Sequence, residues 1–167
     1  MMKKILIAVL LAAPFMVNAQ APKFGALNPS EIINVMPEMA TAQNTLKEAS
    51  DKYTAQGKVL QDEYAKKLNE YDGLLKAKAA DATIAAKEGE LQDLQTRIQT
   101  FQQKAREDLE RQQETLFQPI QTKLINAIQA VGAKGGYAAI LDGSVLLYKG
   151  SEVEDISAKV KAELGIK

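Results

Sequence analysis

The sequence predicts an α+β fold in which a long antiparallel helical hairpin projects as an arm from a small β-rich body. Apolar or small residues recur at spacings of three and four residues through two long stretches, which is the periodicity of a coiled coil. The pattern lapses briefly between the stretches, at residues 77–83. Strand-like segments lie near both ends of the chain, so we assign residues 20–36 and 132–167 to the body and residues 37–131 to the arm.

Residues 1–19 have the pattern of a secretory signal peptide. Two lysines precede an apolar stretch from Ile5 to Val17, and small residues offer a cleavage site after Ala19. The apolar stretch is shorter than the roughly 20 residues that span a bilayer. We therefore expect an exported chain with a cleaved signal peptide rather than a membrane anchor.

The body begins with a predicted strand at Lys23–Leu27, which a strong helix start follows. In Asn28-Pro29-Ser30-Glu31 the asparagine can cap a helix, proline suits the first helical position, and the glutamate complements the free amides. Pro37 interrupts this short helix and fits the first turn of a new one. We expect a strand, a short helix and then a kink into the arm.

Two helical rods are predicted for the arm. The first runs from Pro37 to about Ala80, and the second from Ile84 to Val131, with a bend at Pro119. Rods of similar length with a brief break favour an antiparallel hairpin, and the alternative is one continuous helix that dimerises with another chain. Apolar side chains along the seam are expected to be hairpin core, including Leu46, Tyr53, Leu60, Ile98 and Leu109.

The pattern changes after a group of glycines at residues 132–136, which should end the second rod. Residues 137–141 and Ser144–Tyr148 have strand-like composition and flank Asp142-Gly143, so they predict a tight β-hairpin. A final helix is predicted from Ser151 to Leu164.

Composition excludes most enzyme classes. The chain has no His and no Cys, so it offers no imidazole base, no thiol nucleophile, no disulfide, and no imidazole or thiolate metal site. Lys and Arg total 21 and Asp and Glu total 21, which argues against a nucleic-acid partner. The glycine-rich segment at residues 132–136 lacks the spacing of a phosphate-binding loop. We expect no catalysis and no cofactor.

The body is too thin to be stable alone. Roughly 50 residues with three short strands make a poor core, and a three-stranded sheet has two open edges. Without a disulfide, association of several bodies is the remaining source of stability, so we expect an obligate oligomer. The apolar side chains assigned to this oligomeric body are Phe24, Leu27, Ile140, Val145, Leu147 and Tyr148.

The layout resembles the Skp/OmpH family of periplasmic chaperones. The resemblance covers residues 23–166 and is carried by Asn28-Pro29-Ser30-Glu31-Ile32-Ile33, by the charged hairpin and above all by the C-terminal segments. Those segments are Tyr137-Ala-Ala-Ile-Leu-Asp142, Val145-Leu-Leu-Tyr148 and Ser151-Glu-Val-Glu-Asp155-Ile156-Ser157. They are similar to the family's two closing strands, followed by a helix that opens at Asp-Ile-Ser/Thr.

The resemblance implies a jellyfish-shaped homotrimer, with a β-barrel-like body and three helical tentacles around a cavity. In the family this cavity holds unfolded outer-membrane proteins in the periplasm without ATP, and no stable membrane insertion is expected. One feature departs from the basic tentacles of better-known members: residues 46–114 contain 12 Lys/Arg and 14 Asp/Glu. Apolar contact is therefore the leading candidate for client capture, and contact with anionic lipopolysaccharide is not implied by these near-neutral arms.

Apolar groups off the seam or near the tip of the arm are the candidates for client contact. These are Met39, Val59, Leu74, Ala77, Ala79, Ala80 and Ala82. A solvated helix face with incidental alanines is the alternative interpretation of the same residues. The competing function is a structural or adaptor coiled coil of the cell envelope, which would bind one folded partner through its arms.

Overall fold

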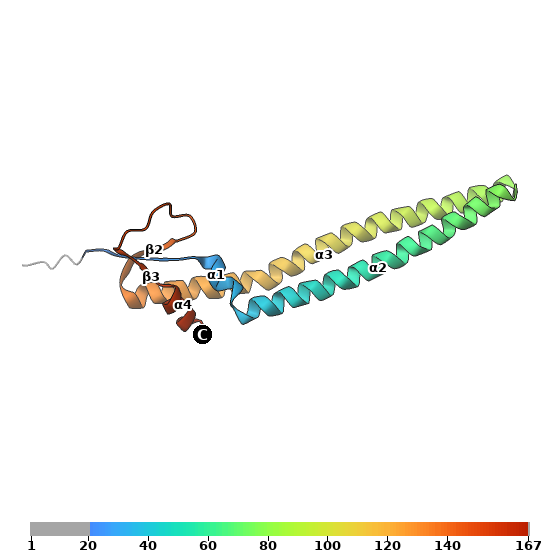
Figure 1. Cartoon of the computed structure of the whole chain (residues 1–167). Helices are drawn as coiled ribbons and strands as arrows, with labels where there is room; N and C mark the ends of the chain where they lie inside the picture. The colour runs from blue at the N-terminus through green and yellow to red at the C-terminus, as the bar shows by residue number, and fades with distance from the viewer. Residues whose placement is uncertain (1–20, 167) are drawn as a thin grey trace, which may run out of the picture.

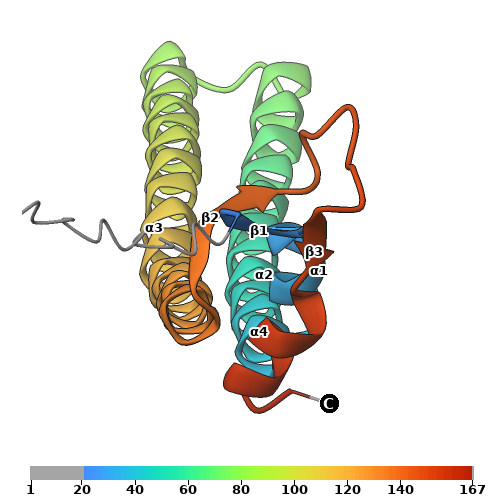
Figure 2. The ribbon, with the colours of Figure 1, turned by 90° about the vertical axis from the view of Figure 1, so that its left-hand side faces the viewer.

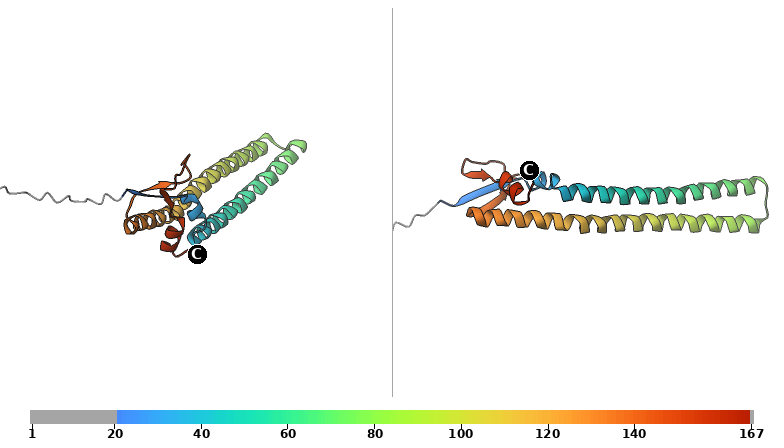
Figure 3. Two further views of the ribbon diagram at one scale, coloured as in Figure 1. Left: turned by 60° about the vertical axis from the view of Figure 1, so that its left-hand side comes forward. Right: turned by 90° about the horizontal axis from the view of Figure 1, so that it is seen from below.

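The computed structural model describes residues 21–166 and has the shape of a long two-helix rod with a small body at one end (Figure 1). The predicted signal peptide, residues 1–19, lies outside the described residues. The body contains all three strands, and the rod consists of two helices that run side by side over most of their length (Figures 1 and 3).

The first elements begin where the sequence predicts. Strand β1 spans Lys23–Leu27 and helix α1 spans Pro29–Asn34. The Asn28 side chain caps α1: its Oδ1 accepts a hydrogen bond from the Ser30 amide at 3.1 Å, and its Nδ2 donates to Glu31 Oε1 at 3.0 Å. The predicted cap and the restart of the helix at the next proline are both confirmed.

The arm is an intramolecular antiparallel hairpin, as predicted. Helix α2 spans Pro37–Lys76 and helix α3 spans Asp81–Gly135, so α2 with its 40 residues is about 60 Å long. A tight turn at residues 77–80 joins them, and Lys78 takes a positive φ of 52° there. The alternative of one continuous helix is wrong, because the chain reverses direction at this turn.

Helix α3 passes through Pro119 without ending. Proline removes one backbone hydrogen bond and crowds the preceding turn, which bends a helix rather than stopping it when tertiary packing holds both sides. Figure 1 shows α3 changing direction as it passes from the body into the arm, in agreement with the predicted bend.

The sheet has three strands in the order β2-β1-β3, with β1 in the centre and both neighbours parallel to it. Strand β2 spans Tyr137–Asp142, as expected, whereas β3 is Val153–Asp155. The predicted strand at Ser144–Tyr148 is wrong, and so is the tight antiparallel hairpin. Residues 143–152 instead form an irregular connection from one edge of the sheet to the other (Figure 2).

Local hydrogen bonds explain this difference. The Asp142 carboxylate accepts from the Ser144 amide at 2.8 Å and from its hydroxyl at 2.6 Å, and the Gly143 amide donates to the Leu27 carbonyl at 2.7 Å. Asp142 thus makes an Asx turn and Gly143 is held by β1, so Asp-Gly does not close a hairpin. Because β2 and β3 run in the same direction, the chain needs such a crossover connection to pass from one to the other.

Helix α4 spans Ser157–Glu163, so the predicted start at Ser151 is too early. Val153 and its two successors pair with β1, and the Asp155 carboxylate then accepts a hydrogen bond from the Ser157 amide at 2.9 Å. The helix therefore opens at Asp-Ile-Ser, as the family resemblance implies.

The core lies where the body meets the arm. Ile32, Ile156 and Val160 are fully buried, at 0% exposure, and side chains from both arm helices join them. The root of the arm is thus part of the packing of the body. The buried members of this cluster are Leu27, Ile32, Met36, Met39, Ala42, Ile120, Leu124, Ala127, Val131, Ile156 and Val160.

Candidate functional site

Beyond the body, the arm has no third layer to cover it. Two packed helices bury one stripe each, so most seam side chains stay partly exposed. Leu91, Leu94 and Ala105 are buried. Tyr53 and Phe101 meet edge to face across the seam, with ring centroids 6.1 Å apart, and both remain half-buried. The predicted seam exists, but it is a narrow contact rather than a filled core.

Polar side chains also join the two helices. Lys67 pairs with Glu90 at 2.7 Å, and Lys87 lies between Glu90 at 3.0 Å and Glu70 at 3.1 Å. Tyr71 donates a hydrogen bond to Glu88 at 2.6 Å. The lysines hold the pKa of Glu90 below its usual value, chiefly through the hydrogen bond from Lys67. Ion pairs and hydrogen bonds therefore join the two helices here, beside the buried Leu91 and Leu94.

A second polar contact lies nearer the middle of the arm. The Tyr53 hydroxyl donates to Asp108, which also accepts from Gln112 and pairs with Arg111 at 2.9 Å. These groups lower the pKa of Asp108, the Tyr53 hydrogen bond contributing most, and the same hydrogen bond raises the pKa of Tyr53. The carboxylate is stabilised as an acceptor and orients the tyrosine, which is a structural use of both groups.

The client candidates fall into two groups. Met39 is buried in the core cluster at 8% exposure, so its predicted position off the seam is wrong: the bend after α1 turns it toward the body. Val59 is 65% exposed and Leu74 is half-buried. The tip alanines lie at the end of the arm and are mostly exposed, Ala79 being half-buried: Ala77, Ala79, Ala80 and Ala82.

Two leucines of α2 that continue the three- and four-residue spacing of the seam are nevertheless exposed. Leu68 is 39% exposed and Leu75 is 45% exposed. Residues 85–90 of α3, which face this part of α2, contain no large apolar side chain. That absence was visible in the sequence and could have identified these leucines as uncovered.

The most apolar hollow of the arm is a groove of about 580 Å³ between the helices, which we call the mid-arm groove. Its apolar side chains are Val59 and Leu60 from α2 and Phe101 from α3. Two cations of α3, Arg97 and Lys104, lie along it. The remaining lining residues are Gln56, Thr96 and Thr100.

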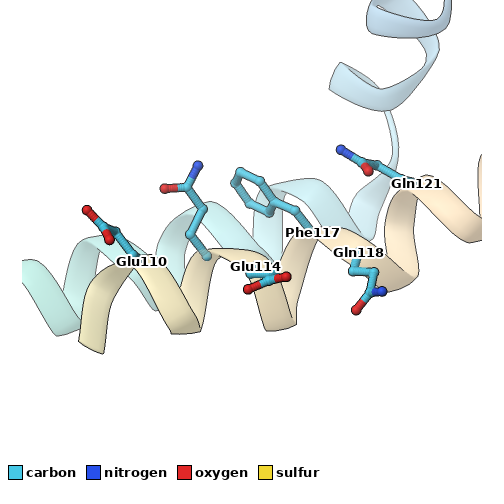
Figure 4. A pocket seen from close by; sticks show the side chains of 6 residues that line it. Glu110, Glu114, Phe117, Gln118 and Gln121 are labelled. Atoms are coloured by element: carbon cyan, nitrogen blue, oxygen red, sulfur yellow. The ribbon is translucent and has the colours of Figure 1, made fainter. Parts of the chain in front are cut away.

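A second hollow of about 560 Å³ lies along α3 alone, near the bend (Figure 4). Phe117 is its one apolar side chain, and Glu110 and Glu114 make it acidic. Its other lining residues are Gln113, Gln118 and Gln121. With a single helix behind it and five polar groups around one ring, this surface is a poor match for an apolar segment.

The residues assigned to the oligomeric body also divide into two groups. Leu27 is buried, and Phe24 and Ile140 are half-buried within the chain itself. Val145 is 74% exposed, Leu147 is fully exposed and Tyr148 is 84% exposed, all on the connection between β2 and β3 that projects from the body (Figure 2). The chain by itself leaves this apolar segment uncovered.

A cluster of charged and polar side chains joins the three strands and α4. Glu154 pairs with Lys23 at 3.0 Å and with Lys159, and it accepts a hydrogen bond from the Tyr137 hydroxyl at 2.7 Å. Hydrogen bonds from Lys159, Tyr137 and Lys23 lower the pKa of Glu154 to about 2. Each partner comes from a different element, so the cluster fastens β1, β2 and α4 to β3.

Within residues 21–166, no three acidic, histidine or cysteine side chains gather closely enough to hold a metal ion. None of the helices in this part of the chain combines the length and apolar character that crossing a membrane requires.

Comparison with known proteins supports the resemblance. The model of the family "Outer membrane protein (OmpH-like)" matches residues 23–164. A similar fold occurs in the crystal structure of a Caulobacter crescentus protein assigned as an OmpH-like outer membrane chaperone, with a TM-score of 0.74 and 16% identity. The match covers 87% of this chain and 85% of that one, whereas no curated protein matches. The chain therefore belongs to the family of OmpH-like outer membrane proteins.

Proposed function

We propose that this protein is an ATP-independent periplasmic holdase that binds unfolded outer-membrane proteins between helical arms and prevents their aggregation. The observation that carries the proposal is the uncovered arm. Over about 60 Å it presents partly exposed apolar side chains on a charged surface. Such a surface suits many weak contacts with a long chain rather than one tight contact with a small ligand.

We further propose that three copies assemble through the body. The outer edges of β2 and β3 have no partner strand within residues 21–166, and residues 145–148 expose apolar side chains. Open edges and exposed apolar segments are normally covered in stable proteins. Pairing of these segments with neighbouring copies would cover both and would place the arms around a shared space.

Several arms around one space would also explain how the client is released without ATP. Each contact is weak, but linked contacts raise the effective concentration of the others, so the client is held and remains mobile. Because the arms carry nearly equal numbers of positive and negative residues, apolar contact supplies more of the binding than net charge does. Release then follows when a client buries its own apolar surface on folding.

The decisive experiment dilutes several urea-denatured outer-membrane proteins into buffer with and without the mature protein and follows light scattering. About one trimer per client is expected to suppress aggregation of all of them, and native mass spectrometry should give the mass of three chains plus one client. Equal aggregation with and without the protein would refute the holdase and favour an adaptor that binds a folded partner.

A shortened chain locates the activity. Deletion of residues 53–112, with the ends joined, leaves every buried residue of the core cluster in place. The shortened protein is expected to remain an oligomer by sedimentation and to lose aggregation suppression. An oligomer that retains full suppression would place the client surface on the body.

A further inference from the structure

Two positively charged side chains line the mid-arm groove. Arg97 and Lys104 are exposed, and neither forms a salt bridge within residues 21–166. No aspartate or glutamate lines the groove. Elsewhere on the arm, Lys67 and Lys87 are paired across the hairpin, whereas Lys52, Lys66 and Arg106 also form no salt bridge within residues 21–166. The groove therefore combines an apolar floor, two cations without a salt bridge and no acidic lining residue.

The other side of the seam provides a contrast. A groove there shares Phe101, but its lining residue Lys58 is already paired with Asp62 at 2.7 Å. Arg106, which also lines that side, borders a hollow that includes Glu107 and Glu110. The groove on that side also has no acidic lining residue, and Arg106 forms no salt bridge within residues 21–166, so the two sides differ in degree. Two cations without a salt bridge line the mid-arm groove, and one lines the other groove.

We propose that the mid-arm groove binds an extended segment of unfolded polypeptide in which apolar residues alternate with carboxylates. This inference rests on the proposed holdase function and names the chemistry of its client. An apolar client side chain lies against Val59 and Phe101, where it displaces water from exposed apolar surface. Client carboxylates lie beside Arg97 and Lys104 and supply the negative charge that the lining residues of the groove lack.

The spacing of the two cations supports an extended occupant. They are seven residues apart, so they lie on the same helix face, separated by about 10 Å along the axis. An extended chain rises roughly 3.3 Å per residue, so the carboxylates of an alternating segment lie about 7 or 13 Å apart on one face. Either spacing is within reach of two long, flexible cationic side chains about 10 Å apart. Transmembrane β-strands alternate lipid-facing apolar residues with polar lumen-facing ones, and an unfolded strand with acidic lumen-facing residues has this composition.

The first test measures binding of fluorescent ten-residue peptides to the full mature protein. One peptide alternates valine or tyrosine with glutamate, the second carries lysine in place of glutamate, and the third carries serine in place of the apolar residues. We expect the acidic-apolar peptide to bind most tightly. The double variant Arg97→Gln with Lys104→Gln should weaken its binding about threefold to tenfold, as expected for two exposed ion pairs.

Arg106→Gln is the control for the single variants Arg97→Gln and Lys104→Gln, because each removes one positive charge from α3 and Arg106 lies on the other face. It should change the affinity less than twofold. Equal weakening by the control would show a general effect of charge and would refute binding in the mid-arm groove. Equal affinities for the glutamate and lysine peptides would also refute it.

The second test uses the absence of cysteine from the chain. A benzophenone is attached at Gln56→Cys in the groove or at Gln103→Cys on another face, and a denatured outer-membrane protein is added. We expect at least threefold more photo-adduct from position 56, concentrated at acidic-apolar client segments. Equal yields would overturn the proposal.

Aggregation assays on the same variants separate the two hypotheses. If the wild type suppresses aggregation but the peptides and cross-links show no preference for the groove, the holdase function is supported and client binding in the mid-arm groove is refuted. If the wild type does not suppress aggregation, the holdase fails, while peptide binding still decides whether the groove has the stated selectivity.

Discussion

The body and the arm differ in how completely they bury their apolar side chains. The body brings five short elements and the roots of both long helices around side chains that are fully buried, whereas the arm leaves its seam half-exposed. Most of the apolar burial is therefore at one end of the molecule, and most of the exposed helical surface is at the other. Stability and client contact are consequently assigned to different regions, so each can be changed with little effect on the other.

The glycines show the same difference. A Cβ on Gly25 in β1 would lie 3.1 Å from the Ile156 side chain, and one on Gly135 would lie 2.3 Å from the Tyr137 ring. A Cβ on Gly73 or Gly89 in the arm would meet nothing within 4 Å. Close approach requires glycine in the body, while the arm tolerates a side chain at either position.

The largest expected effect is a cavity in the body. Ile156→Ala removes a fully buried side chain and should lower the free energy of unfolding by about 3 kcal/mol. Urea denaturation at fixed protein concentration measures the loss. Val59→Ala in the arm, where the side chain is 65% exposed, should change stability by less than about 0.5 kcal/mol. Similar losses for both variants would contradict the division between body and arm.

A methyl group should have opposite effects in the two regions. Gly135→Ala forces the Tyr137 ring to move, although its hydroxyl is held by Glu154 and Lys159, and should cost about 1–3 kcal/mol. Gly73→Ala replaces a poor helix former in open space and should add about 0.5–1 kcal/mol. Thermal unfolding of the two variants provides the comparison, and the same sign for both would refute it.

Acid should weaken the body through Glu154. Its pKa is lowered to about 2 in the folded chain from an ordinary value of 4.5, so its contribution to stability is present above about pH 4.5 and is lost as the pH falls toward 2. Glu154→Gln should flatten the decline of the urea midpoint between these pH values. Glu152→Gln, an exposed neighbour without an ion pair in residues 21–166, is the control and should leave the decline unchanged.

The smallest effect is expected at the tip. Lys78 takes a left-handed backbone conformation, with φ of 52°, which glycine adopts without strain. Lys78→Gly should stabilise the turn by about 0.5–1 kcal/mol, seen as slower amide hydrogen exchange at the tip. Lys76→Gly, which lies within α2, should instead accelerate exchange there.

Elements whose causes are local were predictable from the chain alone. The Asn28 cap, the restart at Pro37 and the glycine-terminated end of α3 each depend on residues within one or two turns, and the structure contains all three. The particular ion pairs do not follow from local spacing in the same way. Asp62–Lys66 and Glu63–Lys67 have the i,i+4 spacing of helix ion pairs, yet Asp62 pairs with Lys58 and Lys67 pairs with Glu90 across the hairpin.

The position of the third strand, β3, could not be predicted from local residues. Ser144–Tyr148 has more strand-forming side chains than Val153–Asp155, yet the shorter segment enters the sheet. A strand is decided by the partner that accepts its hydrogen bonds, and here β1 already binds the Gly143 amide and leaves its other edge to β3. The mid-arm groove was equally hidden, because only Val59 of its lining residues stood out as an apolar residue off the seam.

By itself, the sequence determined the periodic arm, its reversal, the caps and the class of chain, because these follow from propensities and spacings that act over a few residues. Only the tertiary structure decided the parallel order of the sheet, the burial of Met39 in the body and the two charges left unpaired beside Val59 and Phe101. These features depend on which distant segments come together. Such contacts are selected by the packing of the whole chain and not by any single stretch of it.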